Sequence, residues 1–170
     1  MTVMTPEEFQ AAYPQVIAWI QKTITAHRSG AKRVSEFGFP RLPLYVSKEF
    51  LENVSAVIVD RVPVPPLSKI GLRRFAEIEA VDHDGITYLD TYFIKRTRAS
   101  DEALHFHELV HVAQWRALGP ERFLRTYADG LERFGYRNSP LERMAYDAER
   151  RFSNSPEPFN LEQLVLSQLS

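Results

Sequence analysis

Residues 100–119, SDEALHFHELVHVAQWRALG, predict one helix whose two ends are both marked in the sequence. Ser100 is a candidate N-cap, and Asp101 and Glu102 follow in the first turn, where the helix dipole stabilises carboxylates. Gly119 marks the other end, because glycine is favoured just past the last turn of a helix. We expect this helix to carry the residues that decide the chemistry of the chain.

The middle of this helix holds a His-Glu-x-x-His motif. His107 and His111 are four residues apart and therefore one turn apart on the same face, where both imidazoles can bind one tetrahedral zinc ion. Glu108 lies about 100° further around the helix, where its carboxylate can reach a water molecule on the zinc rather than the zinc itself. Because zinc lowers the pKa of such a water, Glu108 is the expected general base for attack on a carbonyl group.

A second interpretation is that the motif arises by chance on a helix whose inner stripe includes Leu104, His111 and Trp115. We favour zinc, because two histidines and a glutamate rarely reach this spacing on a helix by chance. His105 is two residues from His107 and therefore on the opposite side of the helix, so we expect it not to be a ligand.

A catalytic zinc site needs a third protein ligand and keeps its fourth position open. The metzincin pattern requires glycine and histidine three and six residues after His111, where this chain has Gln114 and Ala117, so that class is excluded. Glu142, near the start of a later helix, is the first candidate for the third ligand.

Glu142 also fits a purely structural role, because Ser139-Pro-Leu-Glu142 matches a capping box in which the glutamate bonds to the amide of the N-cap. Glu149, two turns along the same helix, is the second candidate ligand, or a partner that orients one of the histidines. Asp147 and Asp129 are further candidates for either role.

The rest of the chain predicts one α+β domain over residues 1–170, with strands confined to its first half. Apolar residues recur every three or four positions over 6–27, which indicates a helix ending near Gly30. Four parts are expected: an N-terminal helix (1–30), a strand-rich part (37–95), the metal-site helices (100–152) and a C-terminal helix (159–170).

Within the strand-rich part, the runs 44–46 and 56–62 are expected to be strands, followed by a rigid proline stretch at 63–66. Residues 75–81 and 86–94 flank a turn at 82–85 and predict a β-hairpin.

Proline and serine signals divide the helical part. Pro120 opens a helix to about Arg133, and Ser139 caps another with Pro140 at its first position. Residues 153–158 predict a loop, after which Asn160 caps the last helix.

Composition narrows the function. The 21 Lys and Arg residues and 22 Asp and Glu residues are interspersed, so a nucleic-acid partner is not expected. The chain has no cysteine, so any metal must be held by His, Asp or Glu. It has no run of about 20 apolar residues and no leader-like N-terminus, which predicts a cytoplasmic protein with no membrane partner.

The segment HELVHVAQ, followed by a helix that carries PLERMAY, resembles the gluzincins, especially their minimal bacterial members, over about residues 85–152. The resemblance implies a zincin-like fold in which a strand at 86–94 lies beside the active-site helix. It also implies zinc as the cofactor, Glu108 as the base, and a ligand set of His107, His111 and Glu142.

One position departs from the family. The thermolysin-like pattern has an aspartate four residues after the ligand glutamate, whereas this chain has Tyr146 there and Asp147 one place further on.

The expected function is that of a zinc metallopeptidase acting on a peptide or protein, which could pair with the edge of the strand within 85–94. Tyr136, Tyr146 and Arg143 are candidate groups for stabilising an oxyanion. Two alternatives stay open: a non-catalytic zinc module of a larger assembly, with the prolines at 63–66 across the cleft, and a metal-free α+β binding domain.

Overall fold

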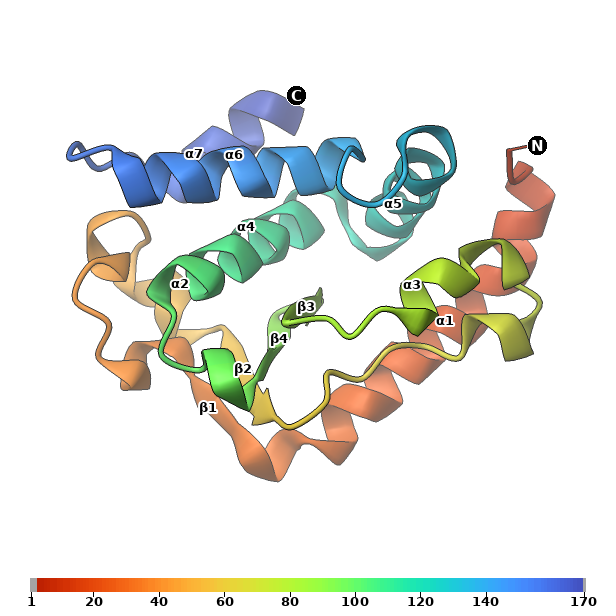
Figure 1. Cartoon of the computed structure of the whole chain (residues 1–170), viewed down its shortest axis with the longest axis horizontal. Coiled ribbons are helices and arrows are strands. Elements are labelled where there is room, and N and C mark those ends of the chain that lie inside the picture. Colours follow the sequence, from red (N-terminus) through yellow and green to blue (C-terminus); the bar gives the residue numbers. More distant parts are fainter. Residues whose placement is uncertain (1–2, 170) are drawn as a thin grey trace.

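A four-stranded mixed sheet forms the centre of the computed structural model, which describes residues 3–169 (Figure 1). The strands are β1 (Ala31–Arg33), β2 (Ser55–Val59), β3 (Gly85–Tyr88) and β4 (Thr91–Lys95). They lie in the order β1-β2-β4-β3; β2 and β4 are parallel, and the other two pairs are antiparallel. The hairpin partner β3 is therefore an edge strand.

Helices cover both faces of this sheet. The helices are α1 (Pro6–Ala26), α2 (Lys48–Glu52), α3 (Ala76–Ala80), α4 (Glu102–Leu118), α5 (Pro120–Phe134), α6 (Pro140–Asn154) and α7 (Leu161–Leu169). Side chains alternate along a strand, so Tyr92 and Ile94 of β4 pack on the α4 side, while Phe93 packs on the α1 side. All three are fully buried, as expected for a strand covered on both faces.

The motif helix α4 is the most enclosed element. Every residue from Leu104 to Trp115 is buried, because the sheet lies on one side of α4 and helices α6 and α7 lie on the other (Figure 1). The stacked rings of Phe106 and Phe152, 4.4 Å between centroids, join α4 to α6. The histidines and Glu108 are therefore held on a rigid, internal helix.

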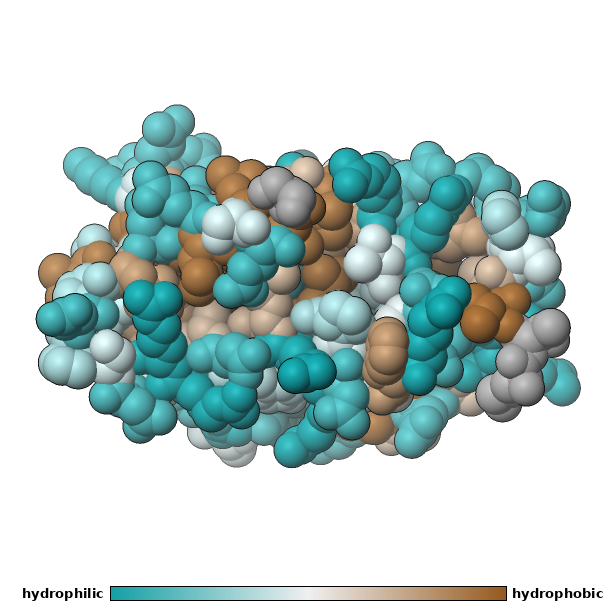
Figure 2. Space-filling model, turned by 90° about the horizontal axis from the view of Figure 1, so that it is seen from above, coloured by the Kyte–Doolittle hydropathy of each residue, from teal (hydrophilic) through white to brown (hydrophobic). Residues whose placement is uncertain are grey.

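The outer face above α6 is mostly hydrophilic (Figure 2). Some hydrophobic side chains also gather on this face. Leu166 of α7 is one of the exposed large hydrophobic residues of the described chain. None of the helices in residues 3–169 combines the length and apolar character needed to cross a bilayer.

The predicted helices are confirmed with small shifts at their ends. Asp101 rather than Ser100 caps α4, because its side chain accepts a hydrogen bond from the Leu104 amide. Helix α6 continues to Asn154 and so includes the first two residues of the predicted loop 153–158. The cap of the last helix is as expected, since the Asn160 side chain accepts from the Gln163 amide.

Two strand predictions are wrong. Residues 75–81 form a short helical segment instead of a strand, because Phe75 and Ile78 are three positions apart and both pack into one cluster with Leu72. The hairpin is made of residues 85–95, so the predicted single strand 86–94 is in fact both of its strands and turns at Leu89 and Asp90; Leu89 adopts a φ of 61°. The run 44–46 follows a 3-10 turn and buries Tyr45 and Val46 without forming a strand.

We expect the contact between α4 and α6 to contribute strongly to stability. Phe152 is 1% exposed, so Phe152→Ala should lower the free energy of unfolding by about 3–5 kcal/mol through lost burial and an unfilled cavity. Urea denaturation measures this loss. Phe134→Ala is the matched control, because Phe134 is 54% exposed and should lose much less; equal losses in the two variants would contradict the assigned packing.

Candidate metal centre

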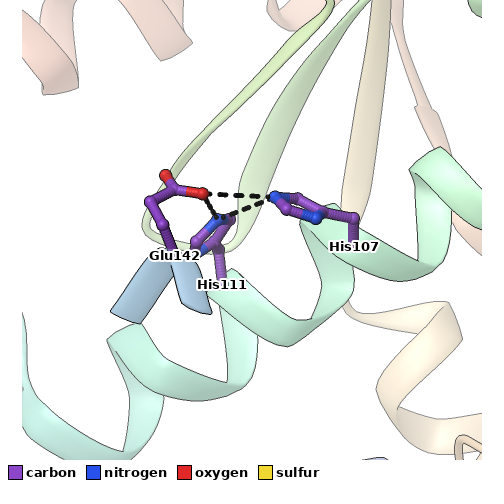
Figure 3. A group of neighbouring side chains, drawn as sticks. All are labelled: His107, His111 and Glu142. Carbon is purple, nitrogen blue, oxygen red and sulfur yellow. Dashed lines mark hydrogen bonds and ion pairs between the residues drawn. The ribbon is translucent and has the colours of Figure 1, made fainter. Parts of the chain in front are cut away.

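Three donor atoms from two helices converge on one point (Figure 3). The Nε2 atoms of His107 and His111, on successive turns of α4, are 3.2 Å apart. The Oε2 atom of Glu142, from the first turn of α6, lies 3.4 Å from Nε2 of His107 and 3.3 Å from Nε2 of His111. All three side chains are buried.

This triangle fits a metal ion. A tetrahedral ion with bonds of about 2.0–2.1 Å separates its ligand atoms by about 3.3 Å, which matches the three observed separations. Oε2 of Glu142 is also the one buried side-chain nitrogen or oxygen atom of the described residues that has no hydrogen-bond partner. A buried carboxylate oxygen without a donor is destabilising, and a cation at this point would satisfy it.

The structural role proposed for Glu142 is not observed. The Ser139 side chain makes no capping hydrogen bond; its hydroxyl instead donates to the carbonyl oxygen of Tyr136. The other Glu142 oxygen, Oε1, accepts a hydrogen bond of 2.8 Å from the hydroxyl of Tyr127 on α5. Glu142 therefore points away from the end of its own helix and toward the histidines.

The second nitrogen of each histidine has its own partner. Nδ1 of His107 lies 3.2 Å from a carboxylate oxygen of Glu149. Nδ1 of His111 lies 2.8 Å from the amide oxygen of Gln114, whose nitrogen donates to the carbonyl oxygen of Leu141. We assign the proton to Nδ1 in both rings, because both partners are acceptors. That tautomer leaves each Nε2 lone pair for a metal.

Without a metal, these groups strongly perturb one another. Burial lowers the pKa of His107, but the neighbouring carboxylates of Glu142 and Glu149 outweigh this effect and raise it to about 10. Burial likewise opposes ionisation of Glu142, yet the neighbouring His111 and His107 hold the pKa of that carboxyl well below its usual range. The metal-free centre is therefore an ion pair, and a metal must displace its proton.

Glu108 is fully enclosed between α4 and β3. Its Oε2 accepts a hydrogen bond of 2.7 Å from the Thr87 hydroxyl. Its Oε1 lies so close to Gly85 that a Cβ atom at that position would be 2.6 Å away. Burial raises the pKa of Glu108, and the charges of His107 and His111 offset part of that rise. Glu108 lines the same pocket as His111 and Glu142.

The two candidate tyrosines lie close to the centre. The ring of Tyr146 lies 4.6 Å from the ring of His107. Tyr136 is half-buried beside His83 and lines the same pocket as Glu108, His111 and Glu142. His105 is buried with both ring nitrogens occupied, by the Tyr92 hydroxyl and by the Ala99 carbonyl.

The remaining candidates lie away from the three donor atoms. Asp147 pairs with Arg150 and Asp129 with Arg133, while Arg143 is exposed.

Four residues of the centre were not predicted as contributors. Gln114 could have been found, since it lies three positions after His111 on the same helix face. Thr87, Gly85 and Tyr127 come from other elements, and no local pattern connects them to the motif.

Comparisons with protein-family models, curated protein sequences and solved structures found no match to this chain. The metal centre must therefore be interpreted from its own geometry.

We expect the protein to bind one divalent metal ion per chain through the three converging donors. Glu142→Ala should lower the affinity by at least about 100-fold, and Glu149→Gln, which alters only an orienting partner, by about 10- to 100-fold. Competition with a chromogenic chelator measures both. Asp147→Asn, on the same helix but paired with Arg150, is the control; a similar loss in this variant would contradict the assignment.

The metal-free protein should lose stability as the pH rises from about 7 to 9. The pKa of His107 is raised from 6.5 to about 10 in the folded state, so folding retains a proton that the unfolded chain releases. This stabilisation is complete below pH 6.5 and is lost as the pH rises through 10, with a slope of at most about 1.4 kcal/mol per pH unit.

Urea denaturation at several pH values measures that slope. His107→Gln should flatten it, and a bound metal ion should flatten it in the unmodified protein because the metal replaces the proton. An unchanged slope in His107→Gln would assign the dependence to another group.

Proposed function

We propose that the protein is a zinc-dependent hydrolase, a metallopeptidase with a zincin-like arrangement of its active-site helix and edge strand. His107, His111 and Glu142 would be the zinc ligands, and Glu108 the general base. The observation that carries this proposal is the unpartnered buried oxygen of Glu142, which lies 3.3–3.4 Å from two histidines whose other nitrogens are already held.

The ligand number supports a catalytic rather than a structural metal. Structural zinc sites are closed by four protein ligands, whereas catalytic sites keep one position open. In residues 3–169, the group of possible metal donors consists of His107, His111 and Glu142, without a fourth His, Asp or Glu. When bound, zinc supplies Lewis-acid activation of a water molecule and of a carbonyl group.

The environment of Glu108 suits a general base. Its burial raises the pKa of the carboxyl, which brings it closer to the pH at which it can both accept and return a proton. The Thr87 hydroxyl occupies Oε2 and fixes the carboxylate in one orientation. Oε1 would therefore take the proton from the attacking water and pass it to the amine that leaves.

The edge strand offers a place for the substrate backbone. In the β3–β4 hairpin, the backbone groups of Ile86 and Tyr88 face β4, so those of Gly85 and Thr87 face outward. The indole of Trp115 already donates to the Thr87 carbonyl, which leaves the groups around Gly85 for an extended peptide. Gly85 also lies against Glu108, so the paired peptide would lie next to the base.

Glu108→Gln is expected to reduce peptide hydrolysis by about 100- to 10,000-fold, since the amide cannot accept the proton. Zinc content should not change, because Glu108 is not one of the three converging donors. Turnover of a mixed peptide library by the zinc-loaded protein, followed by mass spectrometry, measures the loss.

Glu157→Gln, in the exposed loop before α7, is the control and should retain full activity. Equal turnover by Glu108→Gln and the unmodified protein would eliminate the mechanism. A fully zinc-loaded protein that cleaves no peptide would instead favour the non-catalytic zinc module.

A further inference from the structure

A pocket adjoins the metal centre at the free edge of β3. It has a volume of about 140 Å³ and lies between α1, α5 and the segment 64–78. Most of the lining residues on those three elements are apolar, and they include Phe9, Val16, Leu72, Phe75, Leu124 and Leu131. Glu108, His111 and Glu142 line the same pocket. The pocket therefore connects the site of the proposed chemistry with an apolar recess.

Charge restricts what this recess can hold. Among the described residues that line it, the charged groups are those of the metal centre alone. The hydroxyl of Tyr127 donates to Glu142, and that of Tyr88 donates to the carbonyl oxygen of Pro63. Tyr13 and Tyr136 also line the pocket, but their hydroxyls carry no charge, so a charged group in the recess would lose its water without gaining an oppositely charged partner. The recess therefore favours an apolar occupant.

Volume restricts the occupant further. A cavity of about 150 Å³ lined by Leu, Ile and Phe is known to bind benzene. At about 140 Å³, the recess has room for one aromatic ring or one large aliphatic side chain, and not for a long chain.

The elements that form the walls of the recess are joined by polar contacts between segments distant in sequence. Glu132 on α5 pairs with Arg74 at 2.8 Å and accepts a hydrogen bond of 2.7 Å from the amide of Met4, just before α1. These contacts tie α5 to the segment 64–78 and to the start of α1. The recess is thus formed before any ligand binds, as is usual for small-molecule sites.

We propose that this recess receives one aromatic or large aliphatic side chain of a peptide substrate, and so selects peptides with such a residue beside the cleaved bond. The proposal rests on the proposed peptidase function, because it places the peptide backbone along β3 and the side chain in the recess. Ala12 of α1, which lines the recess and is buried, is the position at which the recess can be filled.

The first test compares peptides that differ only in the residue next to the cleaved bond. The zinc-loaded protein should cleave the phenylalanine and leucine peptides with a kcat/KM about 10- to 100-fold above that of the alanine peptide, and peptides with aspartate or lysine there still more slowly. Ala12→Leu should reduce the phenylalanine preference about 10-fold. Its control is Ala11→Leu, the same change at the adjacent exposed position of α1, which should keep the preference.

The second test separates the recess from the peptidase activity. Benzene should bind the metal-free protein and shift the NMR signals of methyl groups in Val16, Leu72 and Leu124, and Ala12→Leu should abolish that binding while Ala11→Leu does not. Benzene binding without any peptide hydrolysis would support the recess and overturn the proposed function. Hydrolysis without preference for apolar residues, together with no benzene binding, would overturn the recess and leave the function standing.

Discussion

The arrangement of the helical half depends on a carboxylate oxygen enclosed between two imidazole rings. Oε2 of Glu142 is buried, lacks a hydrogen-bond donor and lies within 3.4 Å of both Nε2 atoms. Burying a charge in this way is destabilising unless an opposite charge accompanies it. The protein supplies that charge as a proton on histidine when no metal is bound, and the donor geometry suits a metal in its place.

Keeping this cluster together requires contacts from several elements at once. Each donor is oriented by a partner on its far side: Glu149 for His107, Gln114 for His111 and Tyr127 for Glu142. The apolar contact between α4 and α6 then sets the distance between the two helices, through rings such as Phe106 and Phe152. A metal site with fixed donors loses little freedom on binding, which is a condition for both affinity and catalysis.

Features that depend on residues close together in the sequence could be predicted, whereas features that depend on contacts between distant segments could not. Helix ends depend on caps, prolines and glycines within a few residues, so α1, α4, α5 and α6 were predicted closely. The two histidines share a helix face, and their spacing alone places them together. The sequence leaves the role of Glu142 undecided, because a capping box and a metal ligand both require a glutamate at this position. Only the packing of α4 against α6 distinguishes the two roles. The segment 75–81 was misassigned because its apolar residues fit both a strand and a short helix until Leu72 is placed beside them.

Gly85 shows how the sheet enters the proposed chemistry. Any side chain there would have its Cβ atom 2.6 Å from Oε1 of Glu108, closer than unbonded atoms approach, so the carboxylate would have to move. Thr87, two residues on, faces the same helix and donates to the other oxygen, Oε2. Gly85 and Thr87 act together on Glu108: the lack of a side chain at Gly85 leaves space for the carboxylate, and the Thr87 hydroxyl fixes its orientation. The edge strand therefore positions the proposed base as well as offering a backbone for the proposed substrate, and a shift of β3 by one residue would remove both features, since alternate residues face opposite sides of a sheet.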